Sequence, residues 1–226
     1  MPHGKQAKLL TPKQETAVLT YLQTRRYPVR DRVMFLLSIK AGLRAKEIAL
    51  LTWSMITDAA GQVAEVLALP NTASKGRRGG RTIPLNLTLR AALVDLHQLY
   101  DDVVPPERPV VTSERGGSLT ASSVTKWFFH LYRDVGMTGC SSHSGRRTFI
   151  TRAARKVSDV GGSVRDVQQL AGHASLQTTQ AVYRGRYRGQ AQIGAVNLMD
   201  GVVPVLSLRL CAAAALSHVR TAATVN

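Results

Sequence analysis

Residues 30–53 read RDRVMFLLSIKAGLRAKEIALLTW, and the rest of the fold prediction is built around them. Residues 30–41 are too apolar for a surface helix, so they predict a helix that runs through the core. Gly42 is expected to end this helix, because glycine readily takes the left-handed conformation that follows many helices. A shorter helix is predicted over 44–51, which places Arg44 at a turn between two helices.

The remaining sequence predicts an α+β domain that is mainly helical and has a small antiparallel β-sheet. Thr11-Pro12 is a typical cap and first-turn pair, and it opens a helix over 12–25. Two short strands are expected at 61–69 and 81–85, joined by the basic, glycine-rich sequence PNTASKGRRGG. Further helices are predicted at 87–101, 120–135, 144–157, 163–171 and 175–184.

The charge of the chain indicates a polyanionic partner. Thirty Lys and Arg residues against fourteen Asp and Glu residues give a formal net charge of +16 in 226 residues. This balance favours nucleic acid, although a generally basic surface or a binder of anionic membranes has the same composition. An apolar fraction of 44% is ample for a packed core and does not suggest disorder.

The cysteines and the two ends of the chain bear on its compartment. Cys140 and Cys211 have no metal-ligand spacing and make a disulfide framework implausible, so a reducing interior is expected. The N-terminal sequence MPHGKQAKLL lacks the apolar region of a secretory signal. Pro204 and Arg209 interrupt the apolar tail, which argues against a membrane span. We therefore expect a cytoplasmic, nucleoid-associated protein.

Arg44 is the first candidate functional residue. It follows the glycine that ends a helix, so backbone geometry rather than a flexible arm determines its position. Glu47 lies three residues further on the same helical face and can hold the guanidinium group in place. Taken alone, this segment favours an ordinary ion pair on the surface of a helix.

Lys75, in the basic connector between the two strands, is the second candidate. A lysine at the tip of a hairpin can swing into a groove, and its ammonium group can donate a proton to a leaving alkoxide. Non-specific phosphate contact is the alternative, and it explains Arg77, Arg78 and Arg81 equally well. These three arginines are predicted to bind DNA.

The sequence SSHSGRRTF (141–149) places His143 and Arg146 three residues apart at the start of a predicted helix. Both side chains then project from one side of the helix, near backbone N–H groups that attract anions. Histidine exchanges protons near neutral pH, whereas arginine stays charged and binds two phosphate oxygens. The spacing favours Arg146 over Arg147, which we assign to DNA binding. A structural histidine that caps the helix is the alternative.

His173 follows Gly172 between two predicted helices. The surrounding sequence VRDVQQLAGHASLQTTQAVY (164–183) also has the form of a helix-turn-helix with a glycine in its turn, which would place its second helix in a major groove. That alternative gives no role to the distant Arg44 or to the sequence that contains His143.

Three blocks, GLRAKEIALLTW, HSGRRTF and LAGHASLQTTQ, occur in this order and are specific in combination. Together they resemble the catalytic domain of the tyrosine recombinases, which are the phage-integrase and Xer-like site-specific recombinases. The resemblance covers residues 10–180 and implies a helical catalytic domain over 1–180. These enzymes usually carry a separate N-terminal core-binding domain, and we expect none in this chain.

The resemblance also implies a role for individual residues. The catalytic set would be Arg44, Lys75, His143, Arg146, His173 and Tyr183, with Glu47 as the acidic partner of Arg44. Tyr183 would attack the scissile phosphate to form a covalent 3′-phosphotyrosyl link, and Lys75 would protonate the leaving 5′-hydroxyl. The arginines would offset the charge of the transition state, so no metal or other cofactor is expected.

The resemblance also implies which partners to expect. The protein would cleave and rejoin duplex DNA during integration, excision or resolution of a mobile element, and would oligomerise on the DNA. Neither a membrane nor a small-molecule substrate is expected. A non-catalytic DNA-binding protein, either a degenerate recombinase or a helix-turn-helix regulator, is the main alternative. A basic RNA-binding structural protein is the third hypothesis, and its function would survive Arg44→Ala and Arg146→Ala.

The resemblance stops after Gln180. Many relatives continue with RYIEGDTEA, whereas this chain reads AVYRGRYRGQAQIG from residue 181. One permitted set of codons for 180–190 encodes RYIEGDTEA in a neighbouring frame. We therefore hypothesise that residues 181–226 are an out-of-frame translation; the alternative is a genuine helical tail that docks on a neighbouring subunit. The tyrosine of the relatives would fall one position before Tyr183, and Tyr187 is a poorer second candidate.

Overall fold

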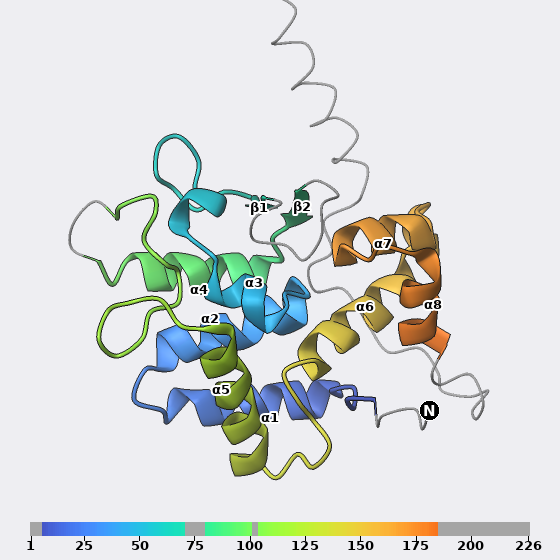
Figure 1. Ribbon diagram of the computed structural model, residues 1–226, viewed down its shortest axis with the longest axis horizontal. Helices are drawn as coiled ribbons and strands as arrows, with labels where there is room; N and C mark the ends of the chain where they lie inside the picture. Colours follow the sequence, from blue (N-terminus) through green and yellow to red (C-terminus); the bar gives the residue numbers. More distant parts are fainter. Residues whose placement is uncertain (1–5, 71–79, 101–103, 185–226) are drawn as a thin grey trace, which may run out of the picture.

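The computed structural model describes residues 6–70, 80–100 and 104–184 (Figure 1). The α-helices in these ranges are α1 (Pro12–Gln23), α2 (Pro28–Lys40), α3 (Ala45–Ala49), α4 (Leu87–His97), α5 (Ala121–Asp134), α6 (Ser144–Lys156), α7 (Val164–Ala171) and α8 (Leu176–Arg184). The strands β1 (Val66–Leu69) and β2 (Arg81–Pro84) pair antiparallel, with Leu67 opposite Ile83. The prediction of a mainly helical α+β fold with a small antiparallel sheet is confirmed. None of the described helices is both long and apolar enough to cross a membrane.

The predicted elements are found at their expected places and differ mainly at their ends. The strand predicted over 61–69 is shorter, because Val63 pairs with Thr57 in an isolated bridge before the chain enters β1. α4 ends at His97, four residues earlier than predicted. The turn that follows α4 brings the ring of Tyr100 edge-on to Trp53, with centroids 6.1 Å apart.

α2 is the central helix of the fold. Its segment Val33–Leu37 is fully buried, and α1, α4 and α6 pack around it (Figure 1). Each large apolar side chain buried in this way contributes roughly 1.5–3 kcal/mol relative to exposure. The prediction of a helix through the core is therefore confirmed. The helix ends at Lys40, with Ala41 as its C-cap and Gly42 as the next residue.

Among the described residues, the buried apolar side chains form two cores. The larger core surrounds α2 and includes side chains from α1 to α5 and from both strands. The smaller core lies between α6, α7 and α8, which stand together at one side of the molecule in Figure 1. Its buried members are Ile150, Ala154, Val157, Val167 and Ala171.

α6 approaches α2 very closely because glycine occupies two of the contact points. A Cβ atom on Gly145 would overlap the side chain of Ser38. A Cβ atom on Gly42 would overlap the ring of Phe149, and Gly42 also has a φ of 66°. The start of α6 is therefore fixed beside the turn that follows α2.

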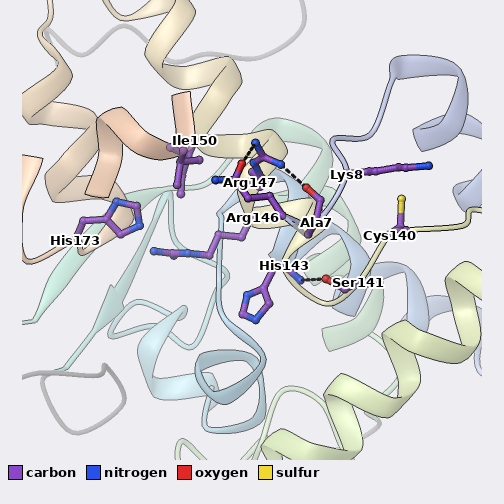
Figure 2. Close-up of a pocket in the computed structure, with 12 residues that line it drawn as sticks. Ala7, Lys8, Cys140, Ser141, His143, Arg146, Arg147, Ile150 and His173 are labelled. Carbon is purple, nitrogen blue, oxygen red and sulfur yellow. Dashed lines mark hydrogen bonds between the residues drawn. The ribbon is translucent and has the colours of Figure 1, made fainter. Parts of the chain in front are cut away.

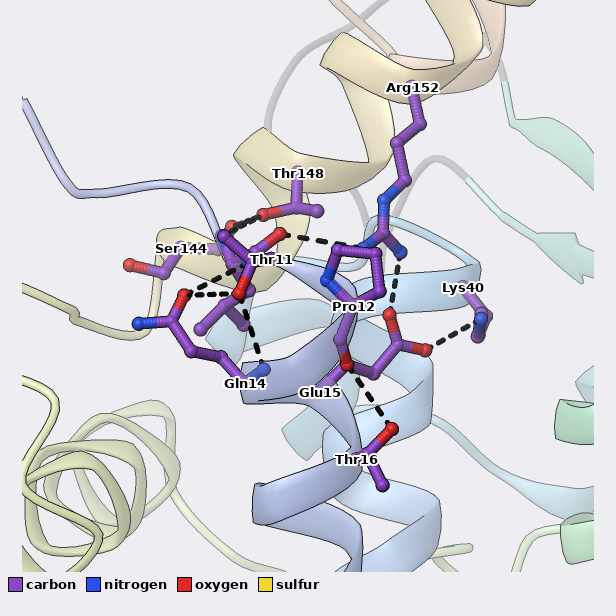
Figure 3. Close-up of polar contacts among 10 residues, drawn as sticks. Thr11, Pro12, Gln14, Glu15, Thr16, Lys40, Ser144, Thr148 and Arg152 are labelled. Atoms are coloured by element: carbon purple, nitrogen blue, oxygen red, sulfur yellow. Dashed lines mark hydrogen bonds and ion pairs between the residues drawn. The ribbon is translucent and has the colours of Figure 1, made fainter. Parts of the chain in front are cut away.

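A buried carboxylate joins α1 to both of these helices (Figure 3). Glu15 lies 2.7 Å from Lys40 Nζ of α2 and 2.6 Å from Arg152 Nη1 of α6. Burial alone would raise the pKa of Glu15, but the hydrogen bonds from Lys40 and Arg152 lower it below its ordinary value. Thr11 caps α1 as predicted, since its hydroxyl accepts the N–H of Gln14 at 3.3 Å.

Candidate catalytic site

Arg44 immediately precedes α3, in the turn that follows Gly42. Glu47 accepts the backbone N–H of Arg44 at 2.8 Å and its Nη1 at 2.9 Å. The Nη2 group of Arg44 donates to the carbonyl oxygen of Gly172 at 3.3 Å. The expected contact with Glu47 is therefore present. It is not an ordinary surface ion pair, because the Glu47 side chain is only 1% exposed.

Arg81 binds the same carboxylate from the first position of β2. Its Nη1 and Nη2 donate to the two oxygens of Glu47, each at 2.9 Å. Burial would raise the pKa of Glu47, but the charges and hydrogen bonds of Arg81 and Arg44 lower it below its ordinary value. Glu47 is therefore ionised at neutral pH and lies between two guanidinium groups. The predicted DNA-binding role of Arg81 stays a prediction, and its guanidinium group faces inwards.

His143 and Arg146 occupy the start of α6, as predicted. His143 is the N-cap residue, and its side chain makes no capping hydrogen bond, so the alternative of a structural cap has no support. Arg146 is only 6% exposed and donates to the carbonyl oxygens of Gly42 and Ala171, at 2.5 Å each. Gly42 follows α2 and Ala171 ends α7, so this one guanidinium group joins the two cores.

The pKa of Arg146 depends on its burial and on the charges of its neighbours. Burial lowers the pKa of Arg146 to about 9, and the nearby guanidinium groups of Arg44 and Arg81 act in the same direction, against Glu47. Arg146 remains protonated at neutral pH. Two guanidinium groups bind Glu47, and that of Arg146 lies within range of its charge, so three positive charges against one negative charge leave an excess for an anion.

The turn between α7 and α8 places His173 beside these arginines. Gly172 ends α7 with a φ of 59°, and His173 is the next residue. The Nδ1 atom of His173 lies 3.0 Å from the hydroxyl oxygen of Thr179, which is fully buried. Burial lowers the pKa of His173 to about 4, and the charge of Arg146 acts in the same direction. The imidazole is therefore neutral at pH 7.

A pocket of about 680 Å³ opens at this place. His143, Arg146 and His173 line it, together with Val182 of α8 and the N-terminal segment Gln6–Lys8. Figure 2 shows the Arg146 and His173 side chains next to each other, with His143 extending from the same end of α6. The sequence blocks that contain these residues therefore meet at one pocket.

Residues 71–79 lie outside the described ranges, and three predicted residues fall within them: Lys75, Arg77 and Arg78. Arg147, the other predicted DNA contact, is described. Its Nη1 donates to the carbonyl oxygen of Ala7 at 2.5 Å and its Nη2 to the side-chain oxygen of Gln6 at 2.6 Å. Arg147 therefore holds the N-terminal segment against α6.

Tyr183 lies in the last turn of α8, one residue after Val182, which lines the pocket. The structure does not describe its side chain, so the role of Tyr183 stays a prediction. Tyr187 and the remaining tail lie outside the described residues, and so does most of the segment to which the reading-frame hypothesis applies.

Sequence reasoning missed three features of this site. It placed Arg81 with the other arginines of the connector, and it gave no role to Thr179 or to the segment Gln6–Lys8. Nothing in the local sequence distinguishes Arg81 from Arg77, because both follow glycine in the same basic stretch. For Thr179 the only signal is its position six residues after His173. Thr179 lies in the first turn of α8, where its side chain meets that of His173.

The comparison with protein families agrees with the geometry of the pocket. The model of the phage integrase family matches residues 8–188, a range that contains every candidate catalytic residue. The chain belongs to the phage integrase family. Tyrosine recombinase XerC of Nitrobacter winogradskyi is 29% identical over 158 residues, which are 69% of this chain and 46% of that protein. XerC of Chromohalobacter salexigens is 30% identical, again over 69% of this chain and over 48% of the relative. This phage integrase chain thus spans about half the length of these relatives.

Solved structures share the fold of this integrase family member. A lambda integrase fragment in a dimer bound to a COC′ core site has a TM-score of 0.63 at 16% identity, covering 86% of this chain and 65% of that one. XerA recombinase gives 0.62 at 19% identity, with coverage of 81% and 61%. The Tn1549 transposon integrase, in complex with circular-intermediate DNA, gives 0.60 at 21% identity, with coverage of 80% and 62%.

Proposed function

We propose that this chain is the catalytic domain of a site-specific recombinase that cleaves and rejoins duplex DNA through a covalent 3′-phosphotyrosyl intermediate. The observation that carries the proposal is the convergence of His143, Arg146 and His173 on one pocket, with Arg44 hydrogen-bonded to Gly172, the residue before His173. The domain would extend over residues 1–180, and 181–226 would form a tail. Membership of the phage integrase family supports the same reaction.

The arginines would bind the scissile phosphate. Arg44 retains 25% exposure of its side chain, and Arg146 lines the pocket, so each can present an N–H group to a non-bridging oxygen. Both groups are already held by carbonyl or carboxylate partners, which keeps them in place before the substrate arrives. Removal of one such preorganised donor typically costs a factor of about 10²–10³ in rate.

His173 would add a hydrogen bond as a neutral imidazole. When the Thr179 hydroxyl donates to Nδ1, the ring proton lies on Nε2 and is available to a phosphate oxygen. A neutral donor can approach the phosphate without adding a further positive charge next to the arginines. With its pKa lowered to about 4, His173 is neutral at pH 7, which suits a hydrogen bond rather than proton transfer.

The covalent step would transfer the phosphoryl group from the DNA to Tyr183. The phenolic oxygen forms a bond to phosphorus while the bond from phosphorus to the 5′-oxygen breaks. His143 would accept the phenolic proton, and Lys75 would donate a proton to the departing 5′-oxygen. The phosphotyrosyl bond conserves the energy of the broken link, so the 5′-hydroxyl can attack it in religation. The two proton transfers then run in the opposite direction.

A nicked duplex tests this reaction. Cleavage close to a nick releases a short fragment by diffusion and traps the covalent adduct, and a pool of random sequences allows for the unknown target. We expect an adduct with the parent chain and with Tyr187→Phe, none with Tyr183→Phe, and at least about 100-fold less with Arg146→Ala. DNA binding without an adduct in any variant would instead support the non-catalytic DNA-binding protein.

The reading frame after Gln180 is tested directly by the nucleotide sequence. If codons 180–190 encode RYIEGDTEA in the neighbouring frame, the tail is an out-of-frame translation, and the nucleophile of the restored frame falls at position 182. If they do not, the hypothesis is wrong and Tyr183 remains the candidate. Restoring the frame and repeating the nicked-duplex assay would then compare the two positions.

A helix-turn-helix regulator is the second candidate, because α7, a turn and α8 follow one another as that motif requires. The recombinase is favoured, since the turn binds Arg44 through Gly172 and orients His173 through Thr179. The proposed partner is duplex DNA, on which the protein would oligomerise, and the proposed location is the cytoplasm at the nucleoid. An RNA-binding structural protein would keep its function after Arg44→Ala and Arg146→Ala.

A further inference from the structure

Arg81 differs from the other two arginines of the site in what its guanidinium group contacts. Arg44 and Arg146 each donate to a backbone carbonyl, and Arg146 lines the pocket. Arg81 has a side chain that is only 9% exposed, and both of its Nη groups bind Glu47 in a forked, two-bond contact. Its buried position makes Arg81 a poor phosphate ligand. Its function must therefore act through Glu47.

Glu47 creates an electrostatic problem for the proposed phosphate site. It is ionised, 1% exposed, and bonded to the guanidinium group of Arg44 at 2.9 Å. A buried carboxylate at this distance would cancel much of the attraction of Arg44 for a phosphate, because opposite charges interact strongly away from water. The carboxylate nevertheless orients Arg44, since it also accepts the Arg44 backbone N–H.

Arg81 resolves this conflict. It forms two hydrogen bonds of 2.9 Å with the carboxylate, whereas the Arg44 side chain forms one. Forked contacts of this kind are the stronger ones, so the negative charge of Glu47 is matched chiefly by Arg81. Glu47 can then orient Arg44 without removing its charge.

Arg81 also contacts the turn that carries His173. The Nη1 atom of Arg81 lies 2.8 Å from the place where a Cβ atom on Gly172 would stand. β2 and α7 are in contact through this region. One guanidinium group thus touches both the residue that orients Arg44 and the residue that precedes His173.

We propose that Arg81 is a positioning residue that offsets the charge of Glu47, so that Arg44 keeps its full attraction for the scissile phosphate. This inference rests on the proposed recombinase function for its biological meaning. Its physical content is independent of DNA cleavage, because it predicts how the site binds an inorganic anion. Arg81 itself would not touch the phosphate.

Three variants separate this role from the alternatives. Arg81→Gln leaves Glu47 free to cancel Arg44, Arg81→Lys keeps the positive charge, and Glu47→Gln/Arg81→Gln removes both charges together. Arg32→Gln is the matched control. Arg32 lies in α2 and forms an exposed ion pair with Asp95 of α4, so this variant removes an arginine away from the site. Urea unfolding of each variant shows whether it is folded, and the doubly neutral variant avoids an uncompensated buried charge.

The probe is inorganic phosphate, with binding followed by NMR of the full chain. We expect Arg81→Gln to weaken phosphate binding about tenfold and Arg81→Lys to stay within about threefold of the parent, since one buried charge changes the local potential by this order. The doubly neutral variant is expected to recover most of the loss. If instead it binds phosphate as weakly as Arg81→Gln while folded, Arg81 is a phosphate ligand or a structural residue and the inference is wrong.

The titration of His173 gives a second readout that a purely structural role would not move. His173 faces the charges of Arg146, Arg44, Arg81 and Glu47, and the first three lower its pKa while Glu47 raises it. Arg81→Gln should raise the pKa of His173, and neutralising Glu47 as well should return it towards the parent value. If the parent chain forms no DNA adduct but both series behave as expected, the proposed function fails and the role of Arg81 stands. An adduct with an unchanged phosphate series gives the opposite conclusion.

Discussion

The ring of Phe149 packs against the backbone of Gly42, in the space that a Cβ atom would occupy. Gly42 lies in the turn between α2 and α3 with a φ of 66°, and Phe149 belongs to α6. The carbonyl oxygen of the same glycine accepts a hydrogen bond from Arg146, one turn before Phe149. Two sequence blocks a hundred residues apart are therefore held together by one glycine.

Gly42→Ala should destabilise the fold by about 3 kcal/mol, because an alanine there meets both left-handed strain and overlap with Phe149. Gly116→Ala is the matched control. Gly116 has a φ of 79° but has no atom near the place of its Cβ, so the control measures the strain alone, about 1 kcal/mol. Urea unfolding at pH 7 gives both values. Equal losses in the two variants would show that the contact with Phe149 contributes nothing.

Glu15→Gln should lower the free energy of unfolding by about 1–3 kcal/mol at pH 7, because it removes the negative charge that Lys40 and Arg152 share. The parent should lose this advantage in acid. The folded-state pKa of Glu15 lies below its ordinary value of 4.5, so the stabilisation is full above that value and disappears as the pH falls through the folded-state pKa.

Unfolding measured at pH 7 and at pH 3 tests this prediction, and the difference between parent and variant should be smaller at pH 3. Glu114→Gln is the control, since the ion pair of Glu114 with Arg26 is exposed and should contribute little at either pH. A difference between parent and Glu15→Gln that stays constant with pH would mean that the ionised form of Glu15 is not what stabilises the junction.

The sequence predicted the helices of this fold well because their signals are local. The apolar run of α2 and the Thr11-Pro12 start of α1 depend only on neighbouring residues, and both are confirmed. The assembly of Arg44, Arg146 and His173 was not a local inference. It came from the resemblance of their sequence blocks to a family. In the structure Arg146 and His173 line one pocket, and Arg44 donates to the carbonyl oxygen of Gly172, which precedes His173.

The missed features depend on the direction of side chains in three dimensions. Arg81 and Arg77 are the same residue type in the same basic stretch, and only the packing of β2 against α7 turns Arg81 towards Glu47. Arg147 was assigned to DNA from its charge. That role stays a prediction. The start of the described chain also passes close to the Arg147 guanidinium group, which no spacing in the sequence indicates.

The pKa of His173 should be about 4 in the folded chain, measured by NMR titration of its ring protons. In the unfolded chain the ordinary value is 6.5, so the unfolded state binds more protons between these two values. Stability should therefore fall as the pH is lowered from 6.5 to 4. A folded-state pKa near 6.5 would contradict both the burial of the ring and its place beside Arg146.

Thr179→Val tests the hydrogen bond that orients this ring. Valine has nearly the same shape as threonine and lacks the hydroxyl, so the buried site is kept and only the contact with His173 Nδ1 is lost. We expect adduct formation on nicked DNA to fall by about tenfold or more, because a misoriented imidazole no longer donates well. Thr178→Val removes the neighbouring hydroxyl, which is exposed and bonded to Ser175, and should leave the rate unchanged.

Arg147→Ala distinguishes the contact seen in the structure from the role predicted from charge. If Arg147 chiefly holds the N-terminal segment, its loss should speed hydrogen exchange at the N–H of Lys8, which donates to Gly139, by about tenfold. Arg155→Ala, on the exposed face of the same helix, removes an equal charge and should leave that exchange unchanged. If Arg147 chiefly binds DNA, the N–H of Lys8 should exchange as in the parent. The affinity for duplex DNA should then depend less steeply on salt concentration, by the amount expected for one lost phosphate contact. The two measurements together assign the residue. Gln6–Lys8 also lines the pocket, so a loosened segment would alter the site without changing the number of DNA phosphates that the protein contacts.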